Sequence, residues 1–471
     1  MSVPTRPLLG ALLAVLSLTA AAAADTVKVQ AGESIQAVLE SGELQAGDTL
    51  KLGKGKYVEV IRIPAELAGL TIQGQGAVLE ALPNGGPSGA AITVDAADVT
   101  ISGLTILHAD DGENPNGGST DGFALFVSAD GFRGEKLKIL RTNGVRIEGN
   151  DAKLDRVDVR ATNGSGISVI ADGATITRCR VEGATEANVS LIGNELVIEK
   201  LTASDAITGV FVVFSEDVVM RNLKLKRTVI GVQAESVTDL HVEKALIEHC
   251  ELGILSRKNT LPVFEKLDVR SAREHGVLTI EDFFPTVRDC RIRDAGQHGI
   301  RVSQPMGQLL IADNRIKDVS LAGIHGGVDD AGFFAFRFNV IDGCATGIDF
   351  AAAAGPVLQE NRITNARDLG LRITGVGSVL SGNLIRKGSG NGIRIDGQGA
   401  LLDGNKVLKV LGEGIQNFAE ACRLRNNTVI KTSGSPLTDA FDGNELIDEG
   451  GNTFGDGVVA GPGVPSAATD F

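Results

Sequence analysis

The chain has 471 residues and a formal net charge of −14, from 59 acidic and 45 basic residues. Nucleic acids and anionic membranes are bound through basic surfaces, so this charge argues against both as partners. Tryptophan is absent and tyrosine occurs once, which disfavours a neutral-glycan binder built on aromatic platforms.

The first residues have the pattern of a signal peptide. Arg6 supplies a positive n-region, Leu8–Leu18 an apolar segment, and Ala20–Ala24 a small-residue cleavage site. We expect residues 1–24 to be removed, which predicts a secreted or periplasmic protein. No later segment approaches ~20 uninterrupted apolar residues, so we expect no membrane insertion.

The mature chain begins with a predicted helix and several short strands. Ser34–Leu44 reads as an amphipathic helix with Ser34 as its N-cap. We expect this helix to cover the first coil, because a solenoid needs a polar cap at its end. Alternating aliphatic residues then predict the first strands at Thr49–Leu52, Leu70–Ile72, Ile92–Val94 and Leu104–Ile106.

A four-residue motif then recurs along the chain: a small residue, an aliphatic, any residue and usually another aliphatic. Each coil also contains several short runs of alternating aliphatics, which is strand patterning. A fixed period indicates a solenoid, so the sequence predicts an all-β parallel β-helix of about 22 residues per coil. The copies begin at Gly144, Gly166, Asn188, Gly209, Gly231, Gly253, Gly276, Gly299, Gly323, Gly347, Gly370, Gly392 and Gly414.

An asparagine column has the same period. Each member precedes an aliphatic by two residues, and Cys179 and Cys290 occupy the same slot in other coils. The spacing predicts a buried ladder in which each amide bonds to the next. The five cysteines are expected to be buried thiols without disulfides. The asparagines are Asn314, Asn339, Asn361, Asn383, Asn405 and Asn427.

Val27–Val78 contains pieces such as Ala31-Gly32-Glu33-Ser34-Ile35-Gln36 and Leu70-Thr71-Ile72-Gln73-Gly74. This stretch resembles the opening segment of pectate-lyase-like β-helix proteins, and the later coils resemble that superfamily's repeats. The resemblance implies a right-handed, single-stranded β-helix over residues 25–460, and we expect residues 461–471 to form a mobile C-terminal tail. It implies no single activity, because the superfamily includes lyases, hydrolases, epimerases, adhesins and accessory proteins.

The residue between the two inward aliphatics of each motif should point outward. On five consecutive coils this residue is Arg301, His325, Asp349, Arg372 and Arg394. Stacked strands lie ~4.8 Å apart, so these side chains should form one line. Arginine binds carboxylates bidentately, and the resemblance implies that this sheet lines a substrate groove. The line therefore fits an acidic polysaccharide; the alternative is a solvated face whose charges pair with each other.

We assign candidate roles along this line. His325, Arg372 and Asp349 are the candidate catalytic residues, with His325 as the base, and Arg301 and Arg394 are the candidate substrate-binding residues.

A metal site is a second hypothesis for the same region. Asp329, Asp330 and Asp349 lie on two adjacent coils and offer oxygen ligands for Ca²⁺. The alternatives are a glycosidase acid with its nucleophile or base, and an ordinary acidic turn.

The leading interpretation is a secreted, monomeric carbohydrate-active protein that binds or cleaves an acidic polysaccharide, as a polyuronide lyase does. The alternative is a non-catalytic surface or periplasmic β-helix. Such a rod could serve as a scaffold or as an accessory protein, like those that mature the copper site of nitrous oxide reductase.

Overall fold

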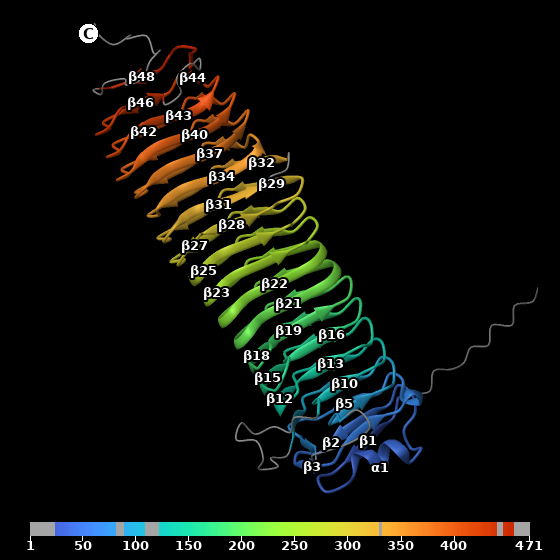
Figure 1. The fold of residues 1–471 in the computed structure, drawn as a ribbon. Coiled ribbons are helices and arrows are strands. Elements are labelled where there is room, and N and C mark those ends of the chain that lie inside the picture. Colours follow the sequence, from blue (N-terminus) through green and yellow to red (C-terminus); the bar gives the residue numbers. More distant parts are fainter. Residues whose placement is uncertain (1–23, 82–88, 109–121, 329–331, 440–445, 456–471) are drawn as a thin grey trace, which may run out of the picture.

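The computed structural model describes residues 24–81, 89–108, 122–328, 332–439 and 446–455. The predicted signal peptide apart from Ala24, the candidate metal ligands Asp329 and Asp330, and the predicted tail therefore lie outside the described residues. Figure 1 shows one long rod of stacked coils, which begins at α1 and ends near β48.

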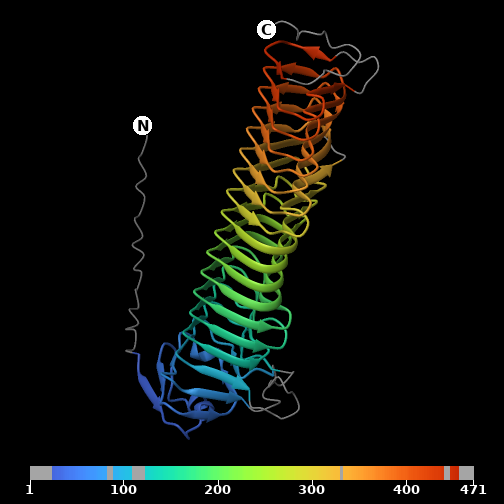
Figure 2. The same cartoon turned by 90° about the vertical axis from the view of Figure 1, so that its left-hand side faces the viewer.

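The rod is the predicted right-handed parallel β-helix, with about 18 turns of about 22 residues. All strand pairings are parallel, and each strand pairs with the equivalent strand one coil later, as Val145 pairs with Ile167. Figure 2 shows the same stack from the side. The strands form three sheets, which we number in the order in which the chain visits them after each glycine motif.

The first sheet carries the glycine motif. It consists of β4 (Ile61–Ile63), β7 (Ile92–Val94), β10 (Leu125–Val127), β13 (Val145–Ile147), β16 (Ile167–Ile170), β19 (Ala187–Ile192), β28 (Ile300–Ser303), β31 (Ala322–Val328), β34 (Thr346–Ala354), β37 (Leu369–Val376), β40 (Asn391–Gln398), β43 (Ile415–Glu420) and β46 (Leu437–Asp439).

The second sheet follows it in each coil. It consists of β1 (Thr26–Val29), β2 (Thr49–Leu52), β5 (Thr71–Gln73), β8 (Thr100–Ser102), β11 (Arg133–Glu135), β14 (Lys153–Asp155), β17 (Thr175–Thr177), β20 (Val197–Glu199), β24 (Val263–Glu265), β26 (Thr286–Arg288), β29 (Gln308–Ala312), β32 (Phe333–Arg337), β35 (Val357–Gln359), β38 (Val379–Ser381), β41 (Leu401–Asp403), β44 (Arg423–Arg425) and β47 (Ile447–Asp448).

The third sheet comes after the asparagine turn. It consists of β3 (Lys56–Val58), β6 (Val78–Ala81), β9 (Thr105–His108), β12 (Lys138–Thr142), β15 (Asp158–Thr162), β18 (Arg180–Ala184), β27 (Arg291–Arg293), β30 (Arg315–Lys317), β33 (Val340–Asp342), β36 (Arg362–Thr364), β39 (Leu384–Arg386), β42 (Lys406–Leu408), β45 (Thr428–Ile430) and β48 (Thr453–Phe454).

Four long strands continue through the corners between sheets. They are β21 (Thr202–Arg221), β22 (Lys224–Glu243), β23 (Leu246–Arg257) and β25 (Asp268–Ile280). Each begins in the third sheet and runs into the first, and β21 and β22 also reach the second.

The N-terminal helix is shorter than predicted. The structure has α1 over Ile35–Glu40, and the Ser34 side chain accepts a hydrogen bond from the Ala37 N–H, as expected of an N-cap. Ile35 and Leu39 are buried, while a 3₁₀ turn, η1, follows at Ala65–Leu67. That α1 closes the first coil stays a prediction. No helix among the described residues is long and apolar enough to cross a membrane.

The asparagine ladder is confirmed. Asn383 is fully buried, and its Nδ2 donates to Asn405 Oδ1 at 2.9 Å and to the Leu358 carbonyl at 2.9 Å. The ladder begins at Cys290, whose N–H donates to Asn314 Oδ1, and it continues to Asn452. All five cysteines are buried and free.

Candidate functional site

The five predicted side chains share one register on the first sheet. Backbone pairing aligns Arg301 with His325, His325 with Asp349, Asp349 with Arg372, and Arg372 with Arg394. They come from β28, β31, β34, β37 and β40, and each lies between two buried aliphatic or aromatic residues or beside a glycine. The predicted outward column therefore exists, because a strand alternates its side chains between core and solvent.

Part of this column is neutralised within the protein. His325 Nδ1 lies 3.5 Å from Asp349 Oδ2. Arg394 Nε donates to Asp396 Oδ2 at 3.0 Å, and Arg372 Nε lies 3.9 Å from the same oxygen. Sequence analysis overlooked Asp396, although it lies two residues after Arg394 and so on the same face of β40. At the C-terminal end of the column, the charges therefore pair with each other, as the alternative in the sequence analysis predicts.

Two histidines that the sequence analysis did not select lie beside the N-terminal end. His275 and His298 each precede the glycine of their motif, on consecutive coils. The ring centroids of His275 and His298 are 5.4 Å apart and their planes are inclined by 28°. Those of His298 and His325 are 4.5 Å apart and inclined by 11°. Three imidazoles thus form a stack that runs from the buried His275 to the partly exposed His325.

Hydrogen bonds fix the two inner rings. His298 Nδ1 accepts a hydrogen bond from the Ala322 N–H at 3.2 Å. The guanidinium of Arg301 lies over the other end, with Nη1 3.3 Å from His275 Nε2. Because both contacts require an imidazole nitrogen that accepts, they favour neutral rings.

The two inner histidines are therefore kept uncharged at neutral pH. Burial, together with the positive charge of Arg301, lowers the pKa of His275 to about 4. Burial also lowers the pKa of His298 to about 4, with smaller contributions from His325, His275 and Arg301. The exposed end of the stack is thus His325, which faces both solvent and the Asp349 carboxylate. An imidazole that lies beside a carboxylate is a candidate general base.

The described residues of this region do not bring several of the predicted calcium ligands together. Asp349 is the one candidate ligand in the described ranges, and its Oδ2 faces His325. The predicted calcium site therefore stays a prediction.

A cluster with metal-like geometry lies elsewhere, on the second sheet. Ligand atoms of His241, Glu243 and Glu265 all lie within 4.8 Å of one another. However, Lys266 Nζ lies 3.1 Å from Glu243 and 3.2 Å from Glu265, and Arg288 lies 2.5 Å from Glu265. Since side-chain cations already surround both carboxylates, we interpret this cluster as an ion-pair network.

Sequence comparison identifies one family. The right-handed β-helix region matches residues 143–283 and 275–433. Among curated proteins, none has a sequence that matches this chain.

Several solved structures give partial matches to this chain. A mannuronic acid specific polysaccharide family 6 lyase from human gut microbiota has a TM-score of 0.41 and 10% identity, covering 71% of this chain and 87% of its own. A PL6 family polysaccharide lyase from Pseudopedobacter saltans has a TM-score of 0.36 and 14% identity, covering 67% and 84%. The catalytic domain of a GH87 α-1,3-glucanase has a TM-score of 0.30 and 11% identity, covering 91% and 69%. Identities this low do not transfer an activity to this chain.

Proposed function

This chain belongs to the right-handed β-helix family, and we propose that it binds an acidic polysaccharide along the first sheet and cleaves it by β-elimination. The observation that carries this proposal is the Arg301–His325–Asp349 cluster at the exposed end of the histidine stack.

Arg301 is the candidate group for the uronate carboxylate. Within the described ranges, no carboxylate lies within 4.0 Å of its guanidinium, and its polar contact is the neutral His275. A guanidinium without an internal carboxylate keeps its fork available for an anionic ligand. It would also stabilise the negative charge that develops on the uronate when the adjacent proton is removed.

His325 is the candidate base, and Asp349 would orient its ring. In the proposed step His325 takes the C5 proton of the uronate, the C4=C5 double bond forms and the C4–O4 bond breaks. The leaving oxygen then takes a proton from the imidazolium or from water. Arg372 would support the developing charge, and Arg394 would bind a neighbouring uronate.

Calcium, secretion and a monomeric state belong to this proposal as well. Ca²⁺ held by Asp329, Asp330 and Asp349 would neutralise the carboxylates of the polymer. Cleavage after Ala24 would place the protein outside the cytoplasm. N-terminal sequencing of the mature protein and light scattering test the last two points.

A non-catalytic scaffold is the second candidate. It is favoured by the pairing of both Arg372 and Arg394 with Asp396, since paired charges bind an external anion more weakly. Such a rod would bind its partner without turnover.

Activity measurements separate these two candidates. Polygalacturonate, alginate and other acidic glycans are incubated with the protein, with and without Ca²⁺, and the absorbance of unsaturated uronate is followed. A lyase should produce this absorbance, and His325→Ala should reduce the rate by about 10²-fold or more. His249→Ala is the matched control, because His249 is exposed but lies within β23 where that strand leaves the third sheet, outside the outward column. If no glycan yields unsaturated product, the lyase proposal is wrong and the scaffold is favoured.

A further inference from the structure

Four cations form a square on the third sheet, a different side of the rod. Arg291 and Arg293 lie on β27, and Arg315 and Lys317 lie at the paired positions of β30. All four are exposed. Paired residues on adjacent strands lie ~4.8 Å apart and alternate residues along a strand about 7 Å apart. We call these four residues the basic square.

The arginines of the basic square differ from Arg270, their neighbour on the preceding coil. Arg270 bonds to Asp268 and lies 3.0 Å from Glu248. In the described ranges, by contrast, no carboxylate lies within 4.0 Å of Arg291, Arg293 or Arg315.

The remaining member of the square has one weak ion pair. Lys317 lies 3.3 Å from Asp318, and both side chains are more than half exposed, so this pair contributes little. On a protein with a net charge of −14, a local group of four exposed cations indicates an anionic ligand when, among the described residues, three of them have no carboxylate within 4.0 Å.

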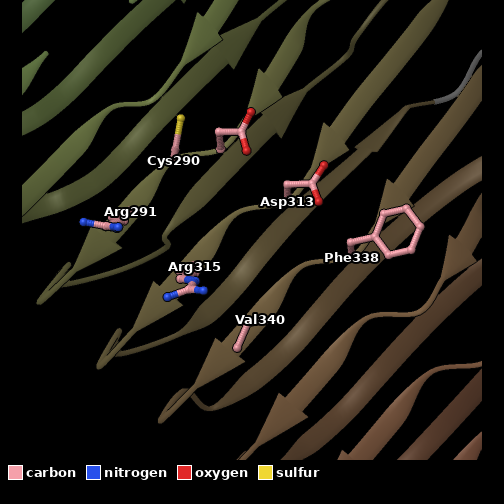
Figure 3. Close-up of a pocket in the computed structure, with 7 residues that line it drawn as sticks. Cys290, Arg291, Asp313, Arg315, Phe338 and Val340 are labelled. Carbon is pink, nitrogen blue, oxygen red and sulfur yellow. The ribbon is translucent and has the colours of Figure 1, made fainter. Parts of the chain in front are cut away.

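A groove adjoins this square at the asparagine turn. It has a volume of about 340 Å³ and is lined by Arg291 and Arg315 together with Asp289, Asp313, Phe338 and other residues. Figure 3 shows Arg291, Arg315 and Val340 at equivalent positions of successive strands, with Asp313 and Phe338 at the turn. Phe338 is 44% exposed and Val340 is 39% exposed.

Phe338 occupies a turn position with a left-handed backbone. Its φ of 56° is left-handed, as are those of Asp289 and Asp313 in the same turn slot of the preceding coils. A left-handed conformation is costly for a bulky side chain, and the same slot one coil later holds Glu360. The turn therefore places an aromatic ring at the surface where its neighbours place carboxylates.

We propose that the groove and the basic square bind a segment of an acidic polysaccharide that carries carboxylate or sulfate groups. Arg291, Arg293, Arg315 and Lys317 match the anionic groups. The Asp289 and Asp313 carboxylates accept hydrogen bonds from sugar hydroxyls.

The groove also provides an apolar surface for binding, because Phe338 and Val340 cover the C–H face of a sugar ring. This site lies on the third sheet, so it is separate from the first-sheet column and binds without cleaving. It is an anchoring site that is independent of the activity proposed above.

The acidic polysaccharide fits better than a nucleic acid. A phosphate backbone needs an extended basic track, whereas Asp289, Asp313 and Asp318 flank this square. A sugar polymer uses such acceptors through its hydroxyl groups.

Affinity measurements on the full protein test this site. Polygalacturonate and alginate provide the carboxylate arm, dextran sulfate the sulfate arm, and neutral dextran the uncharged control. The double variant Arg291→Gln/Arg315→Gln should weaken binding of at least one charged arm about tenfold or more. The matched control Arg160→Gln/Arg180→Gln removes the same charge from the third sheet, where both arginines are ion-paired, and should leave affinity within about twofold.

Two further measurements complete the test. Phe338→Ser should weaken binding of the charged arm severalfold without a change in net charge. The double variant Arg301→Ala/His325→Ala should abolish any cleavage while binding at the third sheet persists, which separates this site from the first-sheet proposal. Equal affinity of the wild type and Arg291→Gln/Arg315→Gln for every charged polymer would overturn the inference, as would tighter binding of an oligonucleotide than of any charged glycan.

Discussion

Replacing Asn383 with alanine should destabilise the rod by removing one rung from the middle of the amide ladder. Asn383 Oδ1 accepts from the Asn361 N–H at 3.0 Å and from Asn361 Nδ2 at 2.9 Å. Its Nδ2 donates to Asn405 Oδ1 and to the Leu358 carbonyl, both at 2.9 Å. All these bonds are buried, so water does not replace them in the folded rod.

The magnitude follows from which groups lose their partners. Asn361 Nδ2 keeps the Phe336 carbonyl at 2.8 Å, and Asn405 Oδ1 keeps the N–H of residue 383 at 3.1 Å. The Asn361 N–H loses its acceptor, Asn383 Oδ1. One buried, unsatisfied donor costs about 1–3 kcal/mol, so we expect the free energy of unfolding to fall by that amount.

Denaturant and thermal unfolding measure this change. Asn163→Ala is the control, because Asn163 is exposed and outside the ladder, and it should change stability by less than about 0.5 kcal/mol. Asn452→Ala, at the partly exposed end of the ladder, should cost less than Asn383→Ala because water reaches the broken bonds. If Asn383→Ala and Asn163→Ala unfold alike, the ladder does not stabilise the rod and the reasoning fails.

Three further predictions concern charge. His275 and His298 have pKa values lowered from 6.5 to about 4, so the stability that they contribute is present above pH 6.5 and is lost as pH falls towards 4. Between about pH 7 and pH 4.5 the wild type should lose up to roughly 3 kcal/mol more of its free energy of unfolding than His298→Gln loses, as measured by urea titration. Burial raises the pKa of Asp282 to about 7, so the stability that Asp282 contributes is present below pH 3.8 and is lost as pH rises through 7. Asp282→Asn should therefore flatten the decline in thermal midpoint between about pH 5 and pH 8. If the decline is unchanged in this variant, another group causes it. Binding of polygalacturonate or alginate should weaken with salt, and Arg372→Ala should weaken it about tenfold. A chelator should weaken this binding only if Ca²⁺ bridges protein and polymer. If neither polymer binds at low salt with Ca²⁺ present, the polyuronide proposal is wrong.

The outward column and the ladder were predictable because a β-helix is nearly one-dimensional. A strand alternates inward and outward residues, and the coil length sets which residues lie above one another. These two periods alone align Arg301 with His325 and Asn361 with Asn383. Contacts between distant parts of the chain do not change this alignment, since each coil contacts only its neighbours.

The N-terminal helix was less predictable. The apolar pattern extended to Leu44, but the helix ends at Glu40 and Ser41 forms its C-cap. Helix ends depend on caps and packing more than on periodicity. At Gly347 the structure shows why this copy of the motif begins with glycine. A Cβ there would lie 2.3 Å from the Gly370 carbonyl oxygen, so close packing between coils requires glycine.

The sequence by itself therefore determined the coil, its register and the composition of each outward column. Only the tertiary structure decided which charges remain available to a ligand. Asp396 binds Arg394 and approaches Arg372, whereas Arg301 reaches the neutral His275, and Phe338 is turned outward beside the basic square. Register places the backbone positions of these residues. Their partners depend on side-chain rotamers and on diagonal contacts across coils, which lie within reach of long side chains but follow no sequence period.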